Sequence, residues 1–138
     1  MPNPSAEPFV TTSEALTEGV RVRVRAHYSP DESDPRASRW FFFYSIQISN
    51  EGSATVQVTD RHWIIIDGSG HTEEVRGEGV VGNQPTLGPG ESFEYTSGCP
   101  LPTPFGSMAG TYLVRREDGT EFRAEIGLFE LVEPRAIH

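Results

Sequence analysis

Three glycines between residues 77 and 82 form a motif that could bind a phosphate, Gly77-Glu78-Gly79-Val80-Val81-Gly82. Their spacing fits G-x-G-x-x-G, which in dinucleotide-binding folds follows a strand and opens a helix whose amides hold a pyrophosphate. Residues 83–90 contain two prolines and two glycines, so they cannot form that helix. A dinucleotide fold is therefore rejected. A backbone nest that binds a small anion stays open, and a purely conformational role for the glycines is favoured.

A second group of polar residues precedes this loop. If the chain is extended there, Asp60 and His62 project to the same face, which permits a pair of metal ligands. Two ligands do not complete a site, so we predict no metal and no cofactor. The favoured interpretation places Trp63 in the core, with Arg61 and His62 hydrogen-bonded to loop carbonyls. The candidate residues for binding an anion or a partner are Gly77, Glu78, Gly79, Gly82, Arg61 and His62.

Cys99 is the single cysteine, and it lies in Gly98-Cys99-Pro100. A nucleophilic cysteine needs a base and an oxyanion site, and the acidic surroundings disfavour a thiolate. We expect a buried or half-buried structural thiol, since free cysteines are among the most buried residues. We predict no catalytic residues, and the protein is not expected to be an enzyme.

Two surface features favour interactions with other molecules. Arg21, Arg23 and Arg25 alternate with apolar residues and therefore share one face of a strand. This face is either solvated and balanced by carboxylates on a neighbouring strand, with Glu121 and Glu125 as candidates, or a patch for an acidic partner. Phe41 and Phe43 face away from the larger aromatic residues of their strand. They form an interface if that face is exposed.

The elements that position these residues are strands. Alternation of apolar and polar residues, together with a high content of β-branched residues, predicts seven strands and no helix, because a strand side chain repeats every two residues. The predicted strands span residues 18–28, 40–49, 55–67, 71–76, 91–97, 111–116 and 121–131. A break in the alternation near Asp60 suggests a bulge or a strand crossing between sheets. Residues 77–90 and 98–110 are expected to be irregular.

The sequence Glu117-Asp118-Gly119-Thr120 joins two alternating runs and predicts a β-hairpin with a primed turn. Amphipathic antiparallel strands bury their apolar faces by packing two sheets together, so the fold class is an all-β antiparallel sandwich, with a closed barrel as the alternative. The expected core consists of Trp40, Phe42, Tyr44, Ile46, Trp63, Ile65, Phe93, Tyr95, Tyr112 and Val114. The domain is expected to span residues 9–133, between tails at residues 1–8 and 134–138.

Composition restricts the function further. The chain has 138 residues and a formal charge of −9, with 11 basic and 20 acidic residues. That charge argues against a nucleic-acid partner, which usually requires a basic field. A single cysteine excludes an internal disulfide, and no signal or spanning segment is evident. We therefore expect a cytoplasmic protein without membrane or nucleic-acid partners, either a monomer or a homodimer.

Several blocks together resemble the bacterial ApaG family: residues 61–67, residues 74–85 with the glycine motif, and residues 93–108 around Cys99. The similarity runs from about Pro8 to Leu131. It implies a fibronectin type III or immunoglobulin-like sandwich and a family without an established reaction. Related domains in some F-box proteins and in a polymerase delta-interacting protein resemble interaction modules. The family is also linked by name to cobalt and magnesium tolerance, and its glycine motif has prompted a pyrophosphate-binding suggestion.

These observations lead to two hypotheses about function. We favour a non-catalytic binding module that recognises an unidentified protein partner. The alternative is a binding protein for a small anion, such as pyrophosphate or a nucleotide, or for a divalent cation. It would act in nucleotide or in cobalt and magnesium homeostasis.

Overall fold

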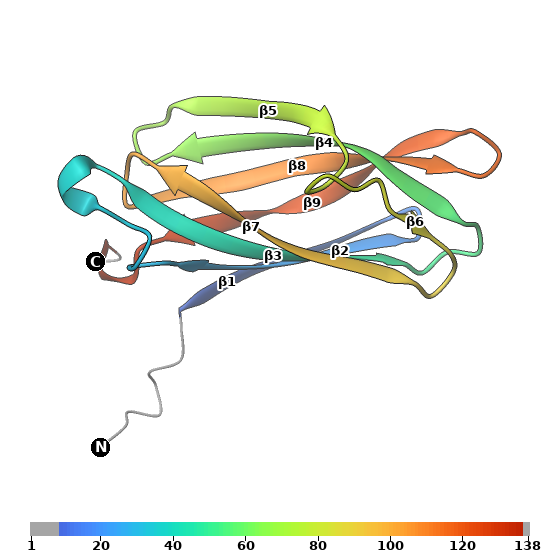
Figure 1. Ribbon diagram of the computed structural model, residues 1–138, viewed down its shortest axis with the longest axis horizontal. Coiled ribbons are helices and arrows are strands. Elements are labelled where there is room, and N and C mark those ends of the chain that lie inside the picture. Colours follow the sequence, from blue (N-terminus) through green and yellow to red (C-terminus); the bar gives the residue numbers. More distant parts are fainter. Residues whose placement is uncertain (1–8, 137–138) are drawn as a thin grey trace, which may run out of the picture.

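The computed structural model describes residues 9–136, which form two antiparallel sheets packed face to face (Figure 1). In chain order the strands are β1 (Val10–Thr17), β2 (Val20–Tyr28), β3 (Trp40–Asn50), β4 (Val56–Asp67), β5 (Thr72–Glu78), β6 (Thr86–Leu87), β7 (Ser92–Leu101), β8 (Phe105–Arg116) and β9 (Glu121–Val132). Two 3-10 turns cover Pro35–Ala37 and Pro134–Ala136. Within the described residues, no helix has the length and apolar character needed to cross a membrane. The predicted tail at residues 1–8 lies outside the described part, as do residues 137–138.

One sheet has the strand order β1-β2-β3-β7 and the other has the order β5-β4-β8-β9, with the short β6 paired to β4. The chain crosses between sheets after β3, β6 and β7. Without β1 and β6, three strands face four, which is the arrangement of a fibronectin type III-like sandwich. The predicted fold class is confirmed, and all seven predicted strands are present.

The core lies between the two sheets, where inward side chains interdigitate. Trp63 on β4 contacts the rings of Tyr44, Tyr112 and Phe129, with centroids 5.4, 6.4 and 6.0 Å away. Six of the ten predicted core residues are buried, and the other four are half-buried against them: Trp40, Ile65, Phe93 and Tyr95.

The predicted irregularity near Asp60 is a β-bulge. The register of β4 against β8 shifts between Val58 and Asp60. Because one extra residue changes the alternation, Val58 before the bulge and Trp63 after it both face the core.

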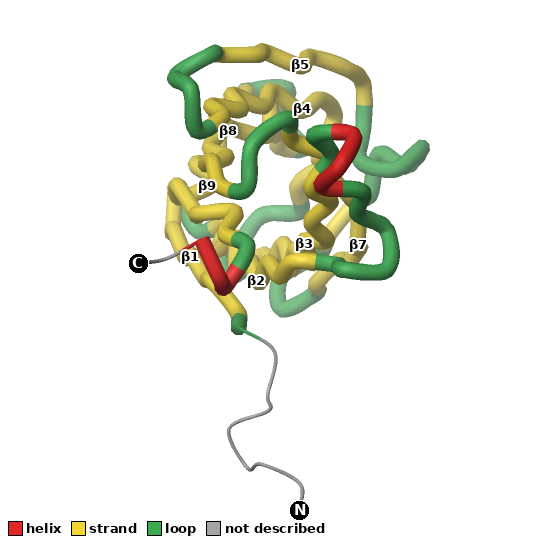
Figure 2. Tube along the Cα trace, turned by 90° about the vertical axis from the view of Figure 1, so that its left-hand side faces the viewer, coloured by secondary structure: helices red, strands yellow, loops and turns green. Residues whose placement is uncertain are grey.

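The sandwich is closed along one side and open along the other (Figure 2). On the closed side β1 lies against β9: Glu125 donates its amide to the Thr17 hydroxyl at 3.0 Å, and the Thr11 hydroxyl donates to the Glu130 carbonyl. On the open side β5 and β7 are the last strands of their sheets. The polypeptide from the end of β5 to the start of β7 crosses this open side, and it contains the glycine motif.

Of the two predicted irregular regions, residues 98–110 were wrong and residues 77–90 are largely irregular as predicted. Residues 98–110 belong mostly to β7 and β8, which extend to Leu101 and begin at Phe105. Their glycines permit close packing: a Cβ at Gly98 would collide with the ring of Phe41, and one at Gly110 with the His62 carbonyl. Within residues 77–90, the first two residues end β5, and residues 86–87 form β6.

Other corrections concern partners and turns. Arg21 pairs with Glu14 and Glu51, and not with Glu121 or Glu125, because β9 lies in the other sheet. The hairpin between β8 and β9 is present. Only Gly119 of its turn has a positive φ, of 86°, so the predicted primed turn is wrong. The strand β1 was not predicted because its mixed threonine, serine and alanine residues give weak alternation.

Candidate functional site

The glycine motif forms a tight two-residue turn at the open side of the sandwich. Val80 donates its amide to the Asn83 carbonyl at 2.7 Å, and Asn83 donates back to the Val80 carbonyl at 2.9 Å. The two central residues, Val81 and Gly82, have φ angles of 44° and 81°. Positive φ at both central positions is the geometry of a type I′ turn. Gly82 adopts it freely, whereas a β-branched valine in this region is a conformational outlier.

The turn is anchored to the bulge of β4. Gly79 donates its amide to the Thr59 carbonyl at 2.7 Å, and the Gln84 side-chain amide donates to the same carbonyl at 2.9 Å. Gly79 has a φ of 66°, and a Cβ there would collide with the Asn83 carbonyl. The amides of Gly79, Val80 and Asn83 are thus all used within the protein.

Arg61 connects β4 to the loop. Its Nη1 donates to the carbonyls of Glu78 and Gly79 at 2.8 and 3.0 Å. A Cβ at Gly77 would lie 2.8 Å from the Arg61 Nη2, so glycine leaves the space that the guanidinium occupies. The guanidinium therefore binds loop carbonyls, as the favoured interpretation of the sequence predicted.

His62 lies on the opposite face of the same strand, because consecutive strand residues point to opposite sides. Its Nε2 is 3.0 Å from Glu74 Oε1 on β5. The predicted hydrogen bond from His62 to a loop carbonyl is not formed. Within residues 9–136, no three histidine, cysteine or acidic side chains are grouped so that they could hold a metal ion.

Below the loop, a cleft of about 350 Å³ opens between the two sheets. Val80 and Val81 line one side of it, and aromatic residues of β3, β4 and β7 line the interior, including Tyr44, Trp63 and Tyr95. Tyr95 and Tyr112 share a hydrogen bond between their hydroxyls. Val81 is half-exposed, at 50%, whereas its neighbour Val80 is fully buried. The cleft is therefore lined mainly by aromatic and aliphatic side chains, with Arg61 and Glu73 among them, and carries an apolar side chain on its rim.

Burial favours the neutral forms of the thiol and phenol groups of the cleft. Burial raises the pKa of the Cys99 thiol to about 12, and the nearby carboxylate of Glu73 adds to this rise. Burial likewise raises the pKa of Tyr95 and of Tyr112 above the ordinary phenol value. Because the thiolate is the nucleophilic form, Cys99 is a poor nucleophile at neutral pH. Its predicted structural role agrees with a side chain only 5% exposed.

Comparison with known proteins identifies the family. A family model described as the ApaG domain matches residues 30–116. The chain belongs to the ApaG family. It is 54% identical to Protein ApaG of Methylobacterium sp. (strain 4-46), a match that covers 87% of this chain and 92% of the relative. It is 52% identical to Protein ApaG of Anaeromyxobacter dehalogenans (strain 2CP-C), over 91% and 99% of the two chains.

A solved structure extends the similarity to three dimensions. The crystal structure of a Bordetella pertussis protein described as ApaA superposes with a TM-score of 0.83 at 50% identity, covering 88% of this chain and 99% of that one. The resemblance found in the sequence is confirmed. The names of these ApaG-family relatives state no reaction.

In this ApaG-family protein the structure brings together five of the six candidate residues. Arg61 contacts the segment that contains Gly77, Glu78 and Gly79, and Gly82 forms the turn beyond it. The sixth, His62, lies on the other side of the sheet. Sequence reasoning missed Val81, since a valine inside a glycine motif gives no sign of its backbone conformation.

Proposed function

We propose that this protein is a non-catalytic module that binds another protein along the open side of its sandwich. The observation that carries the proposal is the pair of edge strands, β5 and β7, which have no further strand partner among residues 9–136 and lie on either side of a cleft lined mainly by aromatic residues. An unpaired edge presents free N–H and C=O groups, which an extended chain can complete as an additional strand.

The two edges differ in how they are protected. Charged side chains blunt sheet edges in natural proteins, and β5 carries Glu73, Glu74, Arg76 and Glu78 within seven residues. In contrast, β7 carries a single charged residue, Glu94, within ten residues. The edge of β7 is therefore the better template for a partner strand.

The strained turn supports the same assignment. Unfavourable backbone conformations persist where the surrounding structure imposes them, and they concentrate at binding sites. Val81 combines a positive φ with an apolar side chain that is half-exposed at the rim of the cleft. The occupant that fits is an extended, uncharged segment of a partner protein. It pairs with β7 and packs one apolar side chain between Val81 and the cleft.

Anion binding by the glycine loop is the competing function. Three loop amides donate to carbonyls of the protein, and the Arg61 guanidinium does the same. Few donors therefore remain for a phosphate, and a net charge of −9 repels anions. These contacts favour a closed connection over an anion nest.

The test places a photo-crosslinking amino acid at position 81 in the native host and identifies the adduct by mass spectrometry. The purified partner is then titrated against the wild type, Val81→Asn and a matched control, Leu128→Asn, which alters an exposed apolar residue of β9. We expect Val81→Asn to weaken binding about tenfold, Leu128→Asn to leave it unchanged, and β7 amides to gain protection from hydrogen exchange.

A second arm tests the anion hypothesis directly. Pyrophosphate or diadenosine tetraphosphate is added and thermal unfolding is followed. A ligand at a hundredfold excess over its Kd stabilises the folded state by about 2.7 kcal/mol. We expect no change in melting temperature. A saturable rise that Gly79→Ala abolishes would make the anion site the primary function.

A further inference from the structure

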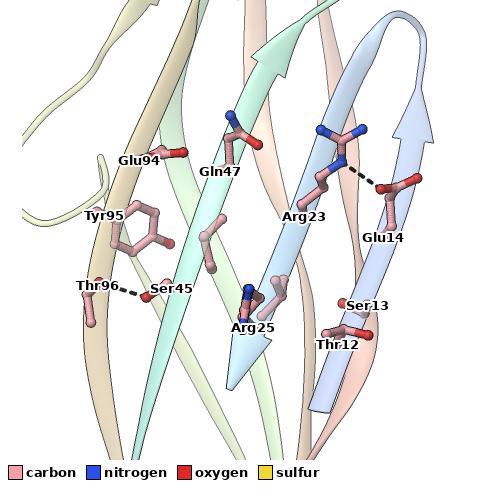
Figure 3. A pocket seen from close by; sticks show the side chains of 12 residues that line it. Thr12, Ser13, Glu14, Arg23, Arg25, Ser45, Gln47, Glu94, Tyr95 and Thr96 are labelled. Atoms are coloured by element: carbon pink, nitrogen blue, oxygen red, sulfur yellow. Dashed lines mark hydrogen bonds and ion pairs between the residues drawn. The ribbon is translucent and has the colours of Figure 1, made fainter. Parts of the chain in front are cut away.

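The outer face of the β1-β2-β3-β7 sheet carries a shallow groove of about 590 Å³, separate from the cleft (Figure 3). The strand register places Thr12, Arg25, Ser45 and Thr96 side by side across the four strands. Ser45 and Thr96 share a hydrogen bond of 2.8 Å between their hydroxyls. One row of the groove thus places the Arg25 side chain among residues that carry hydroxyl groups.

The arginines of β2 differ in how their charges are balanced. Arg21 lies 2.8 Å from Glu14 and 2.6 Å from Glu51, and Arg23 lies 2.7 Å from Glu14. Arg25 has no carboxylate within ion-pair distance among residues 9–136, since the residues opposite it are Thr12 and Ser45. Arg25 is therefore a cation without an ion-pair partner among the described residues, in a chain with almost twice as many acidic as basic residues.

The next row along the sheet is aromatic. His27 and Phe43 are opposite each other, with ring centroids 5.8 Å apart, and Phe43 contacts the edge of Phe41 at 5.1 Å. This row is two residues from Arg25, which corresponds to about 7 Å along a strand. Arginine beside aromatic rings is the composition of energetically dominant protein–protein contacts.

Acidic residues limit what can bind. Glu14 and Glu94 line the groove, and Asp31 and Glu133 line the adjacent hollow beside His27 and Phe43. These carboxylates repel a polyanion such as a nucleic acid, whereas one carboxylate can be balanced by Arg25. The surface is therefore complementary to one acidic side chain with an apolar residue nearby.

We propose that this face docks an extended segment of a partner protein that carries one acidic side chain. Its carboxylate pairs with Arg25, and an apolar side chain two residues away packs on His27 and Phe43. In an extended segment these two side chains share one face and match the spacing of the two rows. The proposal uses a different surface from the cleft and does not depend on strand addition to β7.

The probe is the synthetic peptide Ser-Thr-Asp-Thr-Phe-Thr-Ser, titrated into the full-length protein and followed by the chemical shifts of backbone amides and arginine Nε–H groups. We expect saturable shifts at Arg25, Ser45 and Phe43, with a Kd on the order of 1 mM. Arg25→Gln should weaken binding about fivefold, in line with the loss of one exposed ion pair. Higher salt should weaken the wild-type complex similarly.

Matched controls separate this surface from unspecific binding. Arg123→Gln removes an exposed arginine from β9 in the other sheet and should leave the Kd unchanged. Replacing the aspartate of the peptide by asparagine, or its phenylalanine by serine, should each weaken binding. The proposal is overturned if no chemical-shift changes occur up to 10 mM peptide, which is roughly tenfold above the expected Kd. It is also overturned if Arg25→Gln binds the peptide like the wild type. Shifts that map to β7 edge amides and the glycine loop would overturn it as well.

Discussion

Replacing Val81 by asparagine should stabilise the protein, although most substitutions of partly buried apolar residues destabilise. A left-handed conformation costs an ordinary L-residue about 1–2 kcal/mol, and Val81 has a φ of 44°. Asparagine tolerates this region and is preferred before glycine in type I′ turns. Gly82 already supplies that glycine.

The opposing contribution is the loss of apolar contact. Burying a whole valine side chain contributes about 1.5 kcal/mol, and Val81 is half-exposed, so about half of that contribution is lost. The net gain is about 0.3–1.3 kcal/mol. For a domain of this size such a gain raises the melting temperature by about 1–5 °C.

Differential scanning calorimetry at pH 7 measures this change, with Leu128→Asn as the control because it removes an exposed apolar side chain from another strand. The control should change the melting temperature by less than about 1 °C. A lower melting temperature for Val81→Asn would refute the reasoning. It would show that the valine stabilises the cleft by more than its backbone strain costs.

Three further results are expected. Gly79→Ala should lower the free energy of unfolding by more than about 2 kcal/mol, and Gly82→Ala should lower it by about 1 kcal/mol. Both substitutions strain a left-handed backbone, but only the first adds a collision with the Asn83 carbonyl. Equal losses of stability in urea unfolding would contradict this reasoning. Trp63→Ala should cost about 3–5 kcal/mol in the same assay, and a loss below 1 kcal/mol would mean that the indole is not part of the core. Since the folded pKa of Cys99 is raised from 9.0 to about 12, its unfolded form ionises first, so stability should fall as pH rises from 9 to 12. Cys99→Ala should lessen that fall, and an unchanged alkaline profile would argue against the buried thiol as its cause.

The sequence predicted the strands well where one face is buried and the other is solvated, because alternation then reports burial directly. For β2 and β3 the predicted ends lie within two residues of those observed. Prediction failed where glycines lie inside strands. Gly98 and Gly110 lie where another group comes close to the backbone, and a single sequence does not distinguish such a glycine from one in a loop.

The candidate site could be predicted only in part from the sequence. Local spacing indicated that the glycines and Arg61 belong near one another, since Arg61 precedes the loop by one hairpin. The sequence did not predict which strands far apart in the chain pair with each other. The open side of the sandwich depends on which strands are last in each sheet, and Arg25 lacks a carboxylate because β1 and β3 present Thr12 and Ser45 to it.

The bulge in β4 makes this strand unequally tolerant of single-residue deletions. Val58 and Trp63 are five residues apart, and both face the core because Thr59 is the extra residue of the bulge. An in-frame deletion of the Thr59 codon leaves them four residues apart, so both side chains keep facing the core, and what is lost is the Thr59 carbonyl that anchors Gly79. A deletion of the Ile64 codon lies beyond the bulge and turns every later side chain of β4 to the opposite face. In a library of single-codon deletions, loss of the Thr59 codon should therefore be tolerated better than loss of the Ile64 codon.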